Sequence, residues 1–352
     1  MKYSFKIGSL WGIPIEIHIT FVLLMVLEFL LSFPELYFFA FTLLLFVFVV
    51  VHELSHSVVA RHYGIKVRKI VLYPIGGVSE IEEIPENPSV EWRMAVAGPL
   101  ASFAIGFVLF GLGQVVTIEA APIPVIITTG NFILNLAQVN ILLGAFNLIP
   151  AFPMDGGRVF RALLAERLKF SDATRYAAFI GKLLGVFMAV FGILYDFWLV
   201  IIGVFIYIGA TEEAESTIVS TTLARVRVRD VMLPQVAIAS PETTLADALE
   251  TMFKARSHDV LVEKDGMLQG IVTWSEIMKV SPERRTSMQV QQLPVKQVST
   301  FSDGSILEAY KTMTREKVDV VPVVEREAPT KVVGVVTSQS IAYAYEKAKS
   351  LR

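Results

Sequence analysis

The sequence predicts a polytopic α-helical membrane protein, with about six transmembrane helices and a small membrane-surface β-sheet, followed by a C-terminal α/β module. Three observations support this fold class. Hydrophobic residues make up 54% of the 352-residue chain, against about 45–50% in average proteins, and the mean hydropathy is +0.58. The long apolar runs all lie before residue 212. After that point the hydropathy falls, and one pattern of about sixty residues occurs twice.

Six segments are long and apolar enough to be candidate membrane spans. A helix needs about 20 mostly apolar residues to cross the hydrocarbon core. Pro34 separates the first two segments, because proline breaks a helix. The predicted spans cover residues 15–33, 37–60, 94–115, 124–150, 176–195 and 197–211.

The distribution of lysine and arginine predicts the orientation in the membrane. These residues precede the first span and are frequent between spans two and three and between spans four and five. The alternate loops, around 34–36, 116–123 and 196, contain neither. The positive-inside rule therefore predicts a multi-pass protein of the cell membrane, with its N-terminus and its C-terminal module in the cytoplasm.

The connection between spans two and three reads as β-strands. Residues 64–83 alternate apolar and polar side chains and are interrupted by Pro74 and by Gly76-Gly77. This pattern predicts a short sheet at the membrane surface. An exposed strand edge there could hold an unwound substrate segment by backbone pairing.

The segment His52-Glu53-Leu54-Ser55-His56 lies at the end of a nearly charge-free apolar run. On a helix, His52 and His56 project from one face and can bind the same ion, with Glu53 placed to accept a proton from a water on that ion. The alternative is a pair of histidines that form interhelical hydrogen bonds. Because two histidines and a glutamate are costly to bury in hydrocarbon without partners, metal binding is favoured.

A third metal ligand is expected at Asp155. A catalytic zinc takes three protein ligands and keeps one open position. Pro150 and Pro153 must interrupt the helix before Asp155, and broken backbone is tolerated at membrane depth where it lines a wet cavity. The alternative is that Asp155 only caps the short basic helix that follows. The chain has no cysteine, so a zinc site must use histidine and carboxylate.

These motifs resemble the site-2 protease family of intramembrane zinc metalloproteases, in the branch that carries cystathionine-β-synthase (CBS) domains. The resemblance covers essentially the whole chain and leaves no room for an inserted PDZ domain. The matching segments are His52–His56, Asn147–Gly157, Gly12–His18, Gly76-Gly77 and Ala97-Gly98-Pro99.

The resemblance implies hydrolysis of peptide bonds within the transmembrane helix of another protein. His52, His56 and Asp155 would hold one Zn²⁺, and Glu53 would activate water. Asn147 would bind the substrate backbone or the developing oxyanion, or else satisfy carbonyls of the broken helix. His18, at the start of the first span, could be an extra or inhibitory ligand; as a boundary histidine it is more often an interfacial hydrogen-bonding group.

The C-terminal repeats follow a membrane domain of residues 1–215 and cover residues 220–280 and 286–348. Each reads helix, strand, strand, helix, with helix starts at 241–245 and 302–306. Each closes on a Gly-x-Val-Thr segment, at Gly270–Thr273 and Gly334–Thr337.

This pattern resembles a tandem pair of CBS domains. The resemblance implies a homodimer and an adenine nucleotide (ATP, ADP or AMP) as regulator, with Thr273 and Thr337 facing its phosphate or ribose. The family's ribose-binding aspartate falls on Glu276 and Ser340, so Ser340 should weaken one half-site. A purely structural or dimerising module is the alternative.

Two other functions fit parts of the sequence. A transporter would predict internal repeats across the membrane half and polar sites along a pore. Residues 1–106 and 107–211 show no such repeat, and the ionisable groups concentrate at one depth. An inactive scaffold that binds helices would have no use for Glu53. The net charge of −2 gives no indication of nucleic-acid binding.

Overall fold

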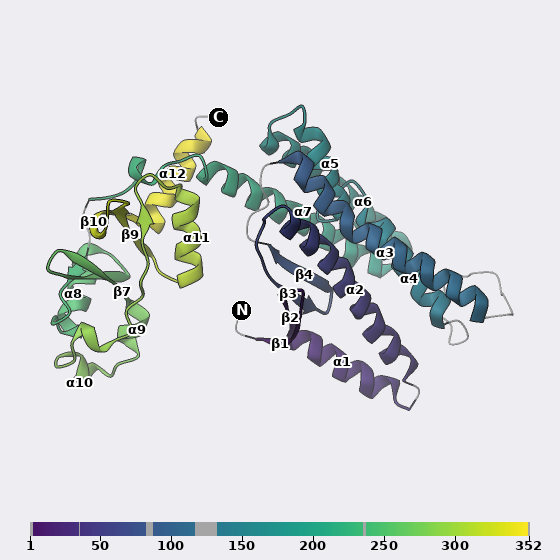
Figure 1. Ribbon diagram of the computed structural model, residues 1–352, viewed down its shortest axis with the longest axis horizontal. Helices are drawn as coiled ribbons and strands as arrows, with labels where there is room; N and C mark the ends of the chain where they lie inside the picture. The colour runs from purple at the N-terminus through teal and green to yellow at the C-terminus, as the bar shows by residue number, and fades with distance from the viewer. Residues whose placement is uncertain (1–2, 35, 82–86, 117–131, 235–236, 351–352) are drawn as a thin grey trace. The chain divides into compact units, whose positions relative to one another are not determined.

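The computed structural model describes residues 3–34, 36–81, 87–116, 132–234 and 237–350 (Figure 1). The chain divides into two compact units, Met1–Glu215 and Ser216–Arg352. Unit 1 holds the apolar helices and a small sheet, and unit 2 holds the two repeats. The predicted fold class is confirmed. The predicted count of about six spans is approximate.

A four-stranded sheet in unit 1 has the order β1-β2-β3-β4. Its strands are β1 (Ser4–Leu10), β2 (Ile13–His18), β3 (Val67–Tyr73) and β4 (Gly76–Ile81). The predicted strands at 64–83 thus form one sheet with an N-terminal hairpin, β1-β2, that was not predicted. Trp11 and Gly12 both have positive φ, which is the type I′ geometry of a two-residue hairpin loop. Buried Ile13 and Ile70 pack the sheet against Leu54.

Seven helices complete unit 1 within the described residues. They are α1 (Ile19–Ser32), α2 (Tyr37–His62), α3 (Pro88–Val116), α4 (Phe132–Asn147), α5 (Asp155–Ala165), α6 (Phe170–Tyr195) and α7 (Phe197–Leu223). By length and apolarity, α2, α3, α6 and α7 can each cross a membrane, whereas α1 and α4 are shorter. The expected start of the first span at residue 15 is wrong, because β2 occupies that segment up to His18. Part of the predicted span 124–150 lies outside the described residues.

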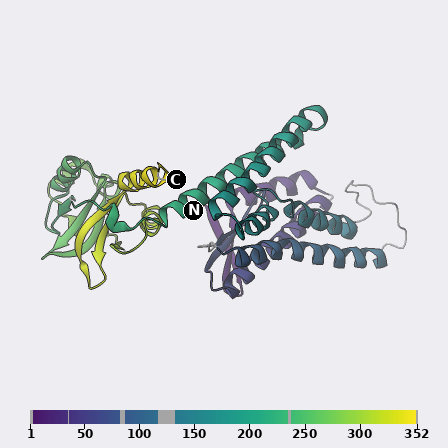
Figure 2. The same cartoon turned by 90° about the horizontal axis from the view of Figure 1, so that it is seen from above.

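The helix that contains the last predicted span is longer than the span itself. We expected the span to end at residue 211, where the charged segment 211–215 begins, and α7 continues as a helix beyond that segment to Leu223. Helix α6 lies alongside α7 (Figure 2). A Cβ atom on Gly185 would come within 2.7 Å of the Gly203 carbonyl oxygen. Glycine thus allows the two backbones to approach closely, as is typical of packed membrane helices.

Unit 2 contains two three-stranded sheets, β5-β6-β7 and β10-β9-β8. The first repeat comprises the 3₁₀ turn η2 (Val228–Asp230), β5 (Ile238–Ala239), α8 (Leu245–Ala255), β6 (Asp259–Lys264), β7 (Met267–Thr273), α9 (Trp274–Met278) and α10 (Pro282–Arg285). The second comprises η3 (Val290–Gln292), β8 (Thr300–Phe301), α11 (Ile306–Glu316), β9 (Val320–Glu325), β10 (Ala328–Thr337) and α12 (Ser338–Ser350).

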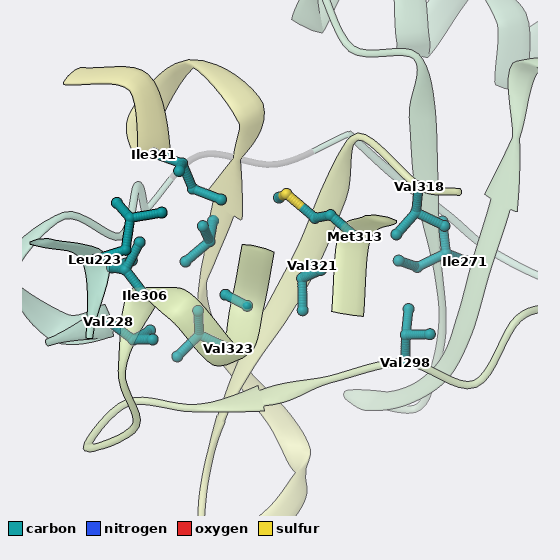
Figure 3. Packing of buried hydrophobic residues seen from close by; sticks show 12 residues of the cluster. Leu223, Val228, Ile271, Val298, Ile306, Met313, Val318, Val321, Val323 and Ile341 are labelled. Carbon is teal, nitrogen blue, oxygen red and sulfur yellow. The ribbon is translucent and has the colours of Figure 1, made fainter. Parts of the chain in front are cut away.

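Both predicted helix starts are present, because Thr244 caps α8 and Ser305 caps α11 through their side chains. The last turns of α7 belong to the core of this unit. Figure 3 shows Leu223 packed with Val228 and Ile306.

Candidate metal centre

Three potential metal ligands converge at the junction of α2 and α5. The Nε2 atoms of His52 and His56 lie 3.2 Å apart, and Asp155 Oδ2 lies 3.2 Å from the first and 3.1 Å from the second. Among the described residues they form the one group of at least three histidine and acidic side chains able to hold a metal ion. Both histidines are buried.

The outer nitrogen of each histidine is held by a neighbour on α3. His52 Nδ1 lies 2.9 Å from Ser102 Oγ, and His56 Nδ1 lies 2.7 Å from the Met94 carbonyl oxygen. The carbonyl can only accept, so His56 Nδ1 carries the proton there, and the Ser102 hydroxyl can accept in the same way. Such partners fix ring orientation and leave Nε2 free to bind a metal.

Gly98 on α3 leaves room beside the two histidines. A Cβ atom at this position would lie 2.2 Å from His56 Nε2 and 2.6 Å from His52 Nε2. Any other residue would therefore intrude on the space that an ion shared by the histidines needs. The Ala97-Gly98-Pro99 segment thus keeps the space beside the two histidines open. This steric role could not be predicted from the sequence.

Asp155 is placed by a tight turn between α4 and α5. It is the first residue of α5, where the unpaired backbone amides of a helix start favour a carboxylate. Gly156 and Gly157 allow the turn to close, since a Cβ atom on either would come within 2.3–2.5 Å of backbone atoms of residues 148–152. The break after α4 that Pro150 and Pro153 predicted is present.

The three ligand atoms fit a zinc ion. Ligands about 2.0–2.1 Å from a tetrahedral zinc lie about 3.3 Å from one another, close to the separations of 3.1–3.2 Å found here. Two imidazoles and one carboxylate are also a donor set that catalytic zinc sites use.

Glu53 lies beside this group and is oriented by strand β4. Its Oε2 atom accepts a hydrogen bond of 2.7 Å from the Ser79 hydroxyl. A Cβ atom on Gly77, in the same strand, would lie 2.6 Å from Glu53 Cγ. Ser79 was not singled out in the sequence, because it is 26 residues from Glu53 and belongs to no recognisable motif.

A cavity of about 760 Å³ opens beside the ligand group. The three ligands, Glu53 and strand β4 line it. Because β4 is the last strand in the sheet order, its outer edge is not paired within that sheet. The three candidate ligands and an edge strand of the sheet therefore line one cavity.

Asn147 and His18 differ in their relation to the site. Asn147 lines the cavity, but its amide donates to the Leu143 carbonyl oxygen at 3.0 Å, as expected for a group that satisfies the end of the broken helix. Its role towards substrate stays a prediction. His18 is the N-cap of α1 and accepts from the Thr20 amide. It is not part of the three-residue ligand group.

Four charged side chains form a cluster beside the same cavity, which Glu91, Arg158 and Glu213 line. Arg161 of α5 donates from Nε to Glu91 Oε1 of α3 at 2.7 Å, and both are buried. Arg158 Nη2 lies 3.3 Å from Glu213 Oε1 of α7, and Arg161 Nη2 lies 3.7 Å from the same oxygen. No local sequence pattern signals this cluster, because its members come from three helices.

The candidate nucleotide-binding residues of unit 2 bond within the first turn of α9 and of α12. Thr273 Oγ1 accepts from the Glu276 amide, and the Glu276 carboxylate pairs with Lys279 at 2.6 Å. Thr337 Oγ1 accepts from the Ser340 amide, while Ser340 Oγ donates to the Thr337 carbonyl oxygen. These contacts account for all four residues without a ligand.

The two repeats of unit 2 are also joined through a buried carboxylate. Asp259 Oδ2 accepts from the backbone amides of Asp319 and Val320. Burial raises the pKa of Asp259 despite these two bonds.

Comparisons with known proteins agree with this description. The model for "Peptidase family M50" matches residues 40–121 and 112–191, and the model for "CBS domain" matches residues 228–283 and 290–347. A zinc metalloprotease of Methanocaldococcus jannaschii is 37% identical over 316 residues, which are 89% of each chain.

Two further proteins are similar. Rip3 of Mycobacterium tuberculosis is 32% identical over 265 residues, which are 71% of this chain and 66% of Rip3. A solved structure of a site-2 protease from M. jannaschii has 43% sequence identity and a TM-score of 0.46, and the match covers 60% of this chain and 95% of that one.

Proposed function

Because this chain belongs to peptidase family M50, the site-2 proteases, and carries a pair of CBS domains, we propose that it is an intramembrane zinc metalloprotease that cleaves transmembrane segments of other proteins. The convergence of His52, His56 and Asp155 beside Glu53 carries the proposal. These three side chains would hold one zinc ion per chain.

The roles of the residues follow from their positions. Zinc, when bound, supplies Lewis acidity to a water molecule and to the scissile carbonyl. Glu53 accepts a proton from the attacking water and delivers it to the leaving amine as the carbon–nitrogen bond breaks. Ser79 holds the Glu53 carboxylate in place. Asn147 can turn from Leu143 towards the substrate backbone or the oxyanion.

The substrate must reach the site in an unwound form, because a helix hides its amides in internal hydrogen bonds. The edge of β4 lines the cavity beside Glu53 and offers backbone groups to an extended segment. Transmembrane substrates with helix-weakening residues should therefore be cleaved faster than leucine-only ones. Equal cleavage of glycine-containing and leucine-only model helices would contradict this.

The orientation is part of the same proposal. Lysine and arginine near the ends of the apolar helices support the proposal that the N-terminus and the CBS pair lie in the cytoplasm of a cell-membrane protein. The chain has no cysteine, so single cysteines introduced at Lys6 and at Glu346 can be labelled without background. A membrane-impermeant thiol reagent added outside intact cells should label neither.

We further propose that the CBS pair forms a homodimer and responds to adenine nucleotides. Since Thr273, Glu276, Thr337 and Ser340 bond to one another or to Lys279, a nucleotide must compete with these bonds, and binding should need millimolar concentrations. Titration calorimetry of the full chain with ATP, ADP and AMP tests this. No heat at millimolar ligand would leave a structural or dimerising role.

The central test needs no substrate. Zinc per purified chain should be near one in the wild type and in Glu53→Gln, and should be lost in Asp155→Ala. Glu53→Gln should also abolish cleavage of a model transmembrane substrate. A well-folded wild-type chain without zinc would refute the protease and favour a transporter. Zinc retained in Asp155→Ala would show that Asp155 is only a cap.

A further inference from the structure

Arg158 has two carboxylates within reach and pairs with the one that is not a metal ligand. It lies three residues after Asp155 on α5, and residues at this spacing are neighbours on a helix surface. Its guanidinium is nevertheless directed to α7, where Nη2 lies 3.3 Å and 3.4 Å from the two carboxylate oxygens of Glu213. Asp155 instead lies against His52 and His56.

Which of the two carboxylates pairs with Arg158 matters because of where these side chains lie. Arg158, Asp155 and Glu213 all line the same cavity, where a charge without a partner is costly. A guanidinium freed from Glu213 would turn to another anion of this cavity, and Asp155 is within its reach on the same helix, whereas Glu91 already accepts two bonds from Arg161. Arg161 is already engaged by Glu91 through Nε, so it does not compete strongly for Glu213, from which it is 3.7 Å away.

We propose that Glu213 is a positioning residue of the metal centre: by holding the Arg158 guanidinium against α7, it leaves the Asp155 carboxylate available to zinc. Without Glu213, Arg158 pairs with Asp155 and competes with the ion for the same oxygen atoms. The inference rests on the proposed metal centre, and it assigns to α7 a part in zinc affinity although α7 supplies no ligand.

The test is the zinc dissociation constant of the full-length protein in detergent, measured by competition with a chromophoric chelator. Glu213→Gln should weaken binding about tenfold, which corresponds to about 1.4 kcal/mol and lies within the range of coupling energies between charged neighbours. The double variant Glu213→Gln with Arg158→Gln should return to within about twofold of wild type, because the competing cation is gone.

Two controls separate this effect from a loss of folding. Glu212→Gln changes the preceding residue on α7, which is exposed, and should leave the affinity unchanged. Glu213→Asp keeps the charge and should recover most of the affinity. A monodisperse elution profile of each variant shows that it is folded.

The outcomes are distinct. An unchanged affinity in folded Glu213→Gln would overturn the inference and leave the metal centre intact. A double variant as weak as the single one would also overturn it, since Arg158 would then not be the competitor. A wild-type chain that binds no zinc would overturn the inference together with the proposed function.

Discussion

Individual residues around the metal centre have separable tasks, and the glycine at position 98 has the most restrictive one. Its missing side chain leaves space beside both His52 and His56 Nε2 atoms. A methyl group there would displace the imidazoles, which α2 and the bonds to Ser102 and Met94 otherwise hold. The ion would then be excluded by the volume of the methyl group, and not by the loss of a hydrogen bond to the histidines.

We therefore expect Gly98→Ala to lose stoichiometric zinc while remaining folded. Gly111→Ala is the matched control, because Gly111 lies on the same helix and a Cβ atom there would meet nothing within 4 Å. Zinc content by atomic absorption and the far-ultraviolet circular dichroism of both variants provide the measurement. Full zinc content in Gly98→Ala would mean that α3 can move away at little cost.

Ser102 contacts His52, one of the proposed zinc ligands, through the ring nitrogen that faces away from the proposed site. Removal of its hydroxyl would leave His52 Nδ1 without its partner at 2.9 Å, and loss of such partners typically costs 10–100-fold in metal affinity. Ser102→Ala should weaken zinc binding by about that factor in a chelator competition. Ser55→Ala is the control, since Ser55 lies between the two histidines in sequence but donates to the Val51 carbonyl. Equal affinities of the two variants would contradict the role of Ser102.

Some residues of the site could be identified from the sequence because they lie in a short motif, whereas others could not because they belong to no motif. His52, Glu53 and His56 lie within one turn of helix, and Asp155 follows a break marked by two prolines. Ser79, Ser102 and Glu213 act on these residues from other elements. Their contribution depends on packing between distant segments. A single serine or glutamate forms no sequence pattern from which this packing could be predicted.

Elements show the same division between local and long-range information. The helix starts at 241–245 and 302–306 were predicted, because their signals lie within a few neighbouring residues, and the structure has the caps Thr244 and Ser305 there. The hairpin β1-β2 was missed because the alternation of residues 4–18 merges into the apolar run of α1. The length of α7 was not predicted, because the charged residues at 211–215 indicate a membrane boundary and carry no information on where the helix itself ends.

The sheet in unit 1 carries an ion pair that makes its stability depend on pH. Lys69 of β3 donates to Glu16 of β2 at 2.7 Å, and this bond, with a second from Ser4, lowers the pKa of Glu16. The unfolded chain therefore binds a proton at a higher pH than the folded one. The contribution of the pair is present above the unfolded pKa of about 4.3 and is lost as the pH falls through the lower, folded value.

Glu16→Gln should remove this dependence. Between about pH 5 and pH 3, the free energy of unfolding should fall more in the wild type than in the variant. The expected difference is about 1 kcal/mol, because the pair is largely but not fully shielded from solvent. Denaturant unfolding in detergent at several pH values measures it. Parallel pH profiles for the two proteins would show that the pair contributes nothing to the stability of the sheet.

At the scale of the whole molecule, the chain consists of two units that have separate cores and share one helix. Unit 1 contains the metal centre, and unit 2 contains the core into which Leu223, at the end of α7, is packed. Unfolding should accordingly show two transitions that respond to different perturbations. If zinc binds the proposed site in the folded form of unit 1 and not the unfolded chain, it should stabilise that unit by about 4 kcal/mol at a thousandfold excess over its dissociation constant.

In scanning calorimetry of the full chain, removal of zinc with a chelator should lower the unfolding temperature of unit 1. The unfolding temperature of unit 2 should stay unchanged. Leu223→Ala should do the reverse, since deletion of a fully buried leucine side chain typically costs about 2–5 kcal/mol. Each perturbation thus serves as the control for the other. If both transitions moved together in either experiment, α7 would have to transmit stability between the units, and they would unfold as one.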